Sequence, residues 1–204
     1  MIRDFADHKW DWEAIDRYPV NYGFNGRIRN TGFRWDGSYD YGNVYRELEL
    51  QNDSRFQDTF ERINDGRSRF EWGEHADQET EEYLEEFLQY CKDNGIEVVG
   101  FAPPFAPCVY ERMTESGNYG YLSEIEPVCS ELFDRYGYTY LDYTDSAVLG
   151  ADDTYFVDGF HGSEVLYALM LKDMADKGSC LENYVDQEKL SELLEKCNSS
   201  LELH

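Results

Sequence analysis

A glycine turn that joins a helical pattern to a short apolar run most constrains the fold of this chain. The helical pattern starts at Glu74, places glutamates on one face and ends at the stop signal Asn94-Gly95. The run at 96–102 follows at once and stops at Pro103-Pro104. A helix leading through a Gly turn into a continuous apolar run is typical of a buried parallel strand. The predicted apolar face of this helix carries Tyr83, Leu84, Phe87, Leu88 and Cys91.

A second helix and strand follow. Residues 121–136 have helical periodicity, with Pro127 either starting the main part of the helix or kinking it, and Gly137 ends the pattern. Residues 138–143 then predict another strand. Strand, crossover helix and strand form a right-handed unit, so we expect 96–102 and 138–141 to be adjacent parallel strands with helices on both faces. Further helices are predicted over about 163–177 and 186–197.

We expect a single domain over residues 1–204. Residues 1–75 are an aromatic, loop-rich N-terminal segment, 76–178 an α/β core, and 179–204 a C-terminal helix. The N-terminal segment could cover a substrate cleft or stack on carbohydrate, or simply pack against the core.

The strongly acidic composition excludes some partners. Forty-three acidic against eighteen basic residues give a net charge of −25, which repels nucleic acid and anionic membrane surfaces. No apolar run is long enough to span a membrane, and five widely spaced cysteines form neither a zinc motif nor a disulfide framework. Asp152, Asp153, Asp158 and His161 are suitable metal ligands without a recognised spacing, so we expect no metal ion and no cofactor.

The segment 154–163 carries the candidate catalytic residues. Asp158 and His161 are three residues apart across a turn, so the carboxylate can hold one imidazole nitrogen and leave the other free as a general base. If His161 lies at a helix N-terminus, the helix dipole favours the neutral ring. In the alternative interpretation Asp158 only caps the next helix. Ligands of open α/β sheets bind beyond the carboxyl ends of the strands, so we expect Pro104 and Asp145 to line the same site.

The order of these motifs resembles the C-terminal half of the SGNH/GDSL hydrolase superfamily, and most closely its cell-envelope branches that transfer or remove acyl groups. The likeness covers about residues 80–175: a Gly turn and strand ending in Pro103-Pro104, a helix, a Tyr-Leu-Asp strand, and Phe-Val-Asp-Gly-Phe-His before a helix. The resemblance implies a three-layer α/β/α sandwich with a parallel, flavodoxin-like sheet, incomplete or modified at its N-terminal side. It also implies that His161 is the general base and Asp158 its orienting acid.

The chain departs from this family in its nucleophile block. Neither Gly-Asp-Ser nor Gly-x-Asn-Asp occurs, and the nearest sequences are Asp36-Gly37-Ser38 and Gln51-Asn52-Asp53. The chain is therefore either the downstream part of a longer protein, which we favour, or a protein with a degenerate site. Ser38 is the nucleophile candidate within the chain.

These observations predict an esterase or acyltransferase domain acting on an acylated or acetylated carbohydrate or cell-wall polymer. The alternative is a non-catalytic domain that binds a glycan or a protein. A sheet without its first strands exposes an edge, which we expect residues 1–75 or a second copy in a homodimer to cover. The sequence leaves the compartment open; the extracytoplasmic part of a cell-envelope protein is one interpretation.

Overall fold

The computed structural model describes residues 31–33, 39–40 and 55–203 of a chain that divides into two compact units, 1–51 and 52–204. In the first unit, β1 (Gly32–Phe33) and β2 (Tyr39–Asp40) pair antiparallel. Phe33 lies opposite Tyr39, and their rings meet edge to face with centroids 5.1 Å apart. The predicted turn at 36–38, including Ser38, lies outside the described residues.

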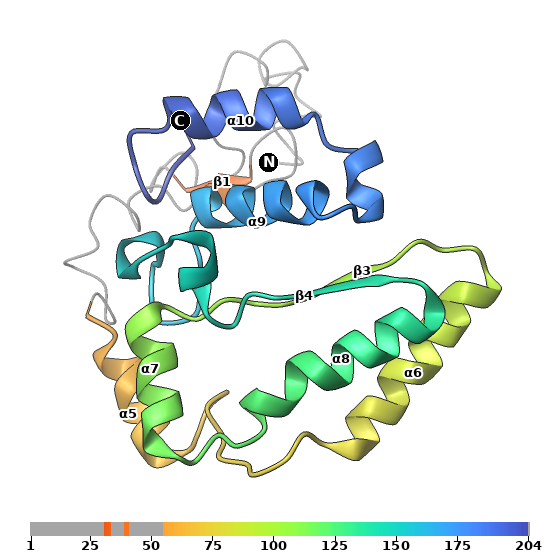
Figure 1. The fold of residues 1–204 in the computed structure, drawn as a ribbon. Coiled ribbons are helices and arrows are strands. Elements are labelled where there is room, and N and C mark those ends of the chain that lie inside the picture. The colour runs from red at the N-terminus through yellow and green to blue at the C-terminus, as the bar shows by residue number, and fades with distance from the viewer. Residues whose placement is uncertain (1–30, 34–38, 41–54, 204) are drawn as a thin grey trace, which may run out of the picture. The chain divides into compact units, whose positions relative to one another are not determined.

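The second unit alternates helices with two short strands (Figure 1). Short 3-10 helices lie at η2 (Ser146–Leu149), η3 (Asp153–Tyr155) and η4 (Cys180–Asn183). The longer elements are α5 (Gln57–Asp65), α6 (Gln78–Asp93), β3 (Val99–Ala102), α7 (Pro107–Ser116), α8 (Leu122–Tyr136), β4 (Thr139–Asp142), α9 (Glu164–Asp176) and α10 (Gln187–Lys196).

The predicted parallel strand pair is confirmed. Strands β3 and β4 are adjacent and parallel, with Val99 opposite Thr139 and Ala102 opposite Asp142. Helices α6 and α8 lie on one side of the pair and α9, covered by α10, on the other (Figure 1). The described part of the second unit is therefore mixed α/β with a small parallel sheet of two strands. A wider sandwich is not shown.

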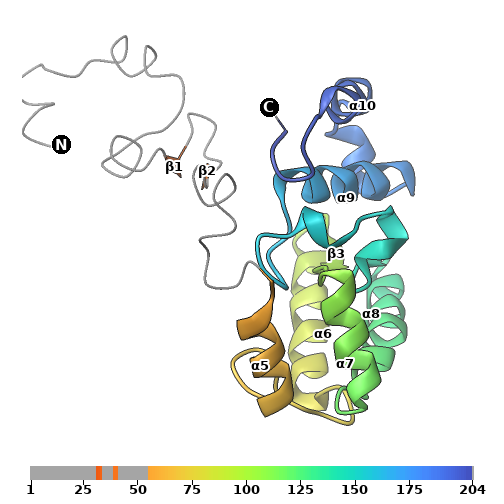
Figure 2. The ribbon, with the colours of Figure 1, turned by 90° about the vertical axis from the view of Figure 1, so that its left-hand side faces the viewer.

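Helix α6 buries a narrower face than the sequence predicts. Leu88 and Cys91 are buried, but Tyr83 and Phe87, which we expected in the core, are 61% and 53% exposed. The reason is that α6 packs mainly on one neighbour, α8, beside which it lies in Figures 1 and 2. Only a narrow stripe of the α6 surface is therefore covered. Tyr83, Phe87 and Tyr90 share the outer face, because residues spaced by three or four lie together on a helix.

Helix α7 was not predicted, because the helix over 121–136 was the one that the pattern indicated between the two strands. It begins at Pro107, whose fixed backbone suits the first helical position, and it buries Val109 and Met113. The crossover between the strands therefore contains two helices. Pro127 lies inside α8, which runs through it.

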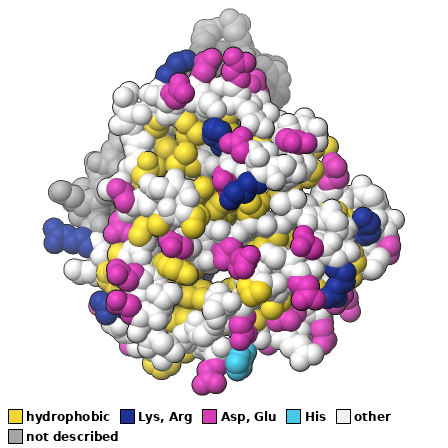
Figure 3. Space-filling model, viewed as in Figure 1, with side chains coloured by type: hydrophobic (Ala, Val, Ile, Leu, Met, Phe, Trp, Pro, Cys, Tyr) yellow, Lys and Arg dark blue, Asp and Glu magenta, His cyan; other side chains and the backbone are white. Residues whose placement is uncertain are grey.

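The described surface is rich in acidic side chains, which are spread over the face seen in Figure 3. The five cysteines carry free thiols. Among the described residues, none of the helices combines the length and the apolar composition needed to cross a membrane.

A glycine in β3 sets how closely α8 approaches the sheet. A Cβ added at Gly100 would lie 2.3 Å from the ring of Phe133. We therefore predict that Gly100→Ala lowers the free energy of unfolding by about 1–3 kcal/mol, measured by urea denaturation. Because the clash is with the ring, adding Phe133→Leu to the Gly100→Ala variant should recover part of the loss. A Gly100→Ala variant as stable as the parent would contradict this packing.

One carboxylate links the start of α8 to the segment that precedes α6. Glu124 accepts hydrogen bonds from the Ala76 N–H and from His75 Nδ1, each at 2.8 Å. The hydrogen bond between them raises the pKa of His75 and lowers the pKa of Glu124. The stabilisation from His75 is complete below its ordinary pKa of 6.5 and is lost as the pH rises through its raised folded value. That from Glu124 is complete above its ordinary pKa of 4.5 and is lost as the pH falls through its lowered folded value.

We predict that this link stabilises the fold most between about pH 4.5 and 6.5. An NMR titration should give His75 a pKa above that of a free histidine, and Glu124→Gln should lower it. The ring signals of His161 at a fixed pH are the internal control, because Glu124→Gln removes no contact of that imidazole. A His75 pKa that does not move in Glu124→Gln would contradict the assignment.

Candidate active site

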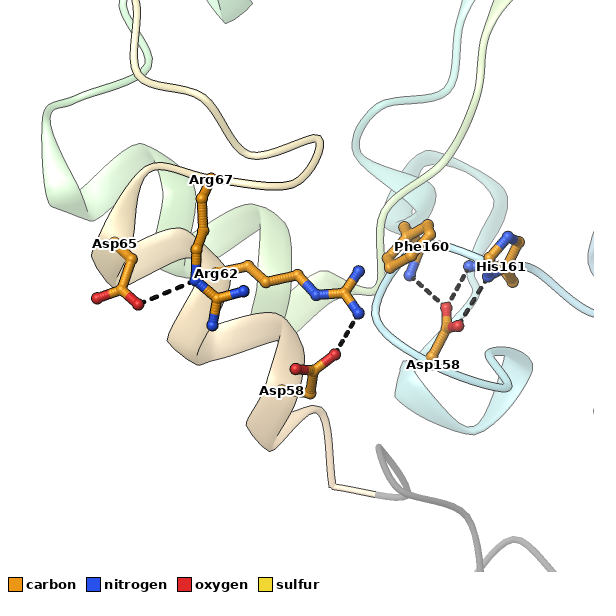
Figure 4. A network of polar contacts seen from close by, with 7 residues as sticks. All are labelled: Asp58, Arg62, Asp65, Arg67, Asp158, Phe160 and His161. Atoms are coloured by element: carbon orange, nitrogen blue, oxygen red, sulfur yellow. Dashed lines mark hydrogen bonds and ion pairs between the residues drawn. The ribbon is translucent and has the colours of Figure 1, made fainter.

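The carboxylate of Asp158 holds the ring of His161 and the turn between them (Figure 4). Asp158 Oδ2 lies 2.7 Å from His161 Nδ1, while Oδ1 accepts the backbone N–H groups of Phe160 at 3.0 Å and His161 at 2.7 Å. Nδ1 therefore carries the proton when the neutral ring faces the carboxylate. His161 Nε2 has no hydrogen-bond partner among the described residues, and the side chain is 56% exposed. This is the arrangement of a general base with its orienting acid.

A narrow backbone turn presents the pair. Phe156 and Gly162 form an antiparallel bridge, and the Val157 N–H donates to the His161 carbonyl at 3.0 Å. Helix α9 begins only at Glu164 and is capped by Ser163, whose Oγ accepts the Leu166 N–H. The interpretation of Asp158 as the helix cap is therefore wrong, and His161 precedes the cap by two residues.

The turn lies beyond the carboxyl ends of both strands, as predicted. The segments that follow β3 and β4 remain paired through a parallel bridge between Phe105 and Asp145. The Ala106 N–H then donates to the Gly159 carbonyl at 3.0 Å, joining the turn to the start of α7. A Cβ at Gly159 would lie 2.6 Å from Thr59 of α5 and 2.8 Å from Val109 of α7, so only glycine fits this contact.

An aromatic ring of the same turn packs against the imidazole of His161. The ring of Phe160 lies 4.4 Å from that of His161 and meets the fully buried Phe70 edge to face at 5.7 Å. The guanidinium groups of Arg62 and Arg69 lie 5.8 and 5.7 Å from the same ring of Phe160. These residues were not predicted from the sequence, because the contacts join segments about ninety positions apart. The aromatic residue directly before His161 was the available signal.

The two predicted substrate-binding residues are placed differently. Pro104 is fully buried, so its ring belongs to the core next to the turn. Asp145 is half-buried and caps η2 by accepting the Ala147 N–H at 3.0 Å. Of these two residues Asp145 is the one with a polar side chain, and direct substrate contact by either stays a prediction.

The other acidic residues of this segment have structural partners. Asp152 caps η3 through Thr154, and Asp153 accepts the Cys108 N–H at 3.0 Å. Within residues 31–33, 39–40 and 55–203, no three His, Cys, Asp or Glu side chains gather to hold a metal ion. Burial, with Asp153 as a further cause, raises the pKa of Cys108 to about 12, so this thiol stays protonated at neutral pH and is a poor nucleophile.

The nucleophile is not assigned by the described residues. None of their Ser, Thr or Cys side chains is hydrogen-bonded to His161, and Ser38 lies outside the described ranges. Asp158 and His161 are thus in contact as predicted, while their catalytic roles and the hydroxyl stay predictions from the sequence.

Comparison of the chain with family models, with curated proteins and with solved structures gave no match.

We predict that Asp158 fixes the tautomer of His161. At about pH 8.5, where an unperturbed imidazole is neutral, ¹⁵N NMR should show the proton on Nδ1 in the parent chain. In Asp158→Asn the amide oxygen can still accept the two backbone N–H groups, but its NH₂ group can face the ring, so the Nε2-protonated form should gain population. Glu124→Gln is the matched control: it replaces the carboxylate that contacts the other histidine, His75, and should leave the tautomer of His161 unchanged. An unchanged tautomer in Asp158→Asn would show that the carboxylate does not orient the ring.

Proposed function

We propose that this chain carries the base half of an SGNH-like acyl-transfer site, and that it acts as an esterase or acyltransferase on an acylated carbohydrate or cell-wall polymer. The observation that carries the proposal is the 2.7 Å contact between Asp158 Oδ2 and His161 Nδ1, with Nε2 exposed and without a partner among the described residues. Its support from sequence is the ordered set of motifs that resembles the SGNH superfamily.

In the proposed reaction His161 Nε2 removes the proton from a nucleophilic hydroxyl as it attacks the ester carbonyl. The Asp158 carboxylate stabilises the imidazolium that forms, without itself taking the proton. The imidazolium then protonates the departing alcohol, which leaves an acyl-enzyme. Water or an acceptor hydroxyl releases the acyl group by the same steps in reverse order. Ser38 is the proposed nucleophile within the chain.

The proposal includes a larger sheet than the described one. We propose that β3 and β4 belong to the parallel sheet of a three-layer α/β/α sandwich. Helices on both sides of the pair support this interpretation. A wider sheet or a homodimer would cover the edge of β3, where Phe101 is 42% exposed.

A non-catalytic binding domain is the second candidate. It is favoured by the outer stripe of α6, where Tyr83, Phe87 and Tyr90 are each more than half exposed. Exposed aromatic rings in a row are suited to stacking on sugars or on the side chains of a partner. In this interpretation the Asp158–His161 pair is a remnant of an ancestral site.

An active-site-directed fluorophosphonate tests the leading proposal. We expect the parent chain to be labelled, His161→Ala to be labelled at least about a hundredfold more slowly because the base is lost, and Ser38→Ala not to be labelled. The matched control is His75→Ala, which removes the other described imidazole–carboxylate pair and should label normally. Labelling that survives in Ser38→Ala would assign another nucleophile. A parent chain that is not labelled would rule out Ser38 and leave either a nucleophile supplied from outside this chain or the binding domain.

A further inference from the structure

Arg69 brings a positive charge close to the proposed catalytic base. The neighbouring arginines have ionic partners: Arg62 pairs with Asp58, and Arg67 with Asp65 at 3.1 Å (Figure 4). The guanidinium of Arg69 has no hydrogen-bond or ion-pair partner among the described residues, although the protein carries a net charge of −25. Its described contact is with the ring of Phe160, and that ring also lies against the imidazole of His161.

The backbone holds Arg69 in an unfavourable conformation. Ser68 and Arg69 have φ angles of 55° and 79°, in the left-handed region that side chains other than glycine rarely adopt. Such a conformation persists only where its surroundings enforce it, and it is concentrated at ligand sites.

The enforcing contacts lie on both sides of the strained pair. Phe70 is fully buried, and its carbonyl accepts the Tyr119 hydroxyl at 2.8 Å. The Trp72 ring covers Gly66, and its Nε1–H donates to the Ile63 carbonyl at 2.9 Å. Packing and hydrogen bonds therefore hold the loop on both sides of Ser68 and Arg69, which fixes the backbone position from which the Arg69 side chain reaches the ring of Phe160.

A guanidinium held near an aromatic face, here with Cζ 5.7 Å from the ring centroid of Phe160, still has N–H donors to offer. These donors match the two oxygens of a carboxylate or two oxygens of a phosphate. Contact with the ring also reduces the freedom that the side chain loses on binding. Arg69 and the imidazole of His161 lie 5.7 and 4.4 Å from the same ring of Phe160, so an anionic group bound at Arg69 would share this aromatic neighbour with an ester placed at His161.

We propose that Arg69, positioned on Phe160, is an anion-binding subsite that holds a carboxylate or phosphate of the substrate beside His161. The assignment of the bound anion to a substrate rests on the proposed function. With that function, the subsite narrows the substrate class to acylated carbohydrates that carry a negative charge. Binding at the subsite can be measured without turnover.

The test is titration of the full chain with sodium glucuronate, with inorganic phosphate and with glucose, followed by NMR at the Arg69 Nε–H and the His161 ring. An ionic strength on the order of 0.01 M limits screening. Arg69→Asn removes the charge while keeping a residue that tolerates a positive φ. Arg67→Asn removes the neighbouring charge from the same loop and is the matched control.

We expect at least one anion to bind the parent and Arg67→Asn equally, to bind Arg69→Asn roughly tenfold more weakly or worse, and glucose not to bind. Binding of glucuronate alone identifies a carboxylate, and binding of phosphate alone a phosphate. Affinities for Arg69→Asn within about twofold of the parent, or no binding of either anion to the parent, would overturn the proposal. His161→Ala should retain anion binding, so loss of fluorophosphonate labelling and loss of the subsite are separate outcomes.

Discussion

The close approach of Gly159 to two helices is the constraint on which the candidate site depends. Its backbone passes so near Thr59 and Val109 that any side chain would collide with them, and its carbonyl is bound by the Ala106 N–H. Asp158 and Phe160 flank this glycine, so the positions of the acid and of the aromatic ring both follow from it. Helices α5 and α7, which contact each other, thereby determine where His161 is held.

The protein contains two described imidazole–carboxylate pairs, and their settings differ. The His75–Glu124 pair joins residues 49 positions apart, and its histidine side chain is 78% exposed. The corresponding side chains of the second pair are less exposed: His161 is 56% exposed, and Asp158 is 24% exposed against 37% for Glu124. Glu124 accepts one backbone N–H group and Asp158 accepts two. The first pair therefore connects two distant segments, and the second holds a short turn at the carboxyl ends of the strands.

Local patterns in the sequence predicted the elements that depend on local physics. Asn94-Gly95 ended α6, the apolar runs gave β3 and β4, and the spacing of Asp158 and His161 gave their contact. Features set by tertiary packing were missed. The exposure of Tyr83 depends on how many helices contact α6, and the left-handed backbone at Ser68 and Arg69 has no signature in those residue types. The group formed by Phe70, Phe160 and Arg69 depends on contacts that no local periodicity encodes.

The shortness of the segment carrying Asp158 and His161 has a consequence for how such a site assembles. The seven residues from Phe156 to Gly162 close on themselves, and so short a closure costs little chain entropy. The contact between Asp158 and His161 is therefore local in sequence, whereas the place of the turn in the fold depends on the packing of Gly159 against Thr59 and Val109. In the proposed site the hydroxyl would be the one group that has to come from elsewhere, whether from a remote segment or from another molecule.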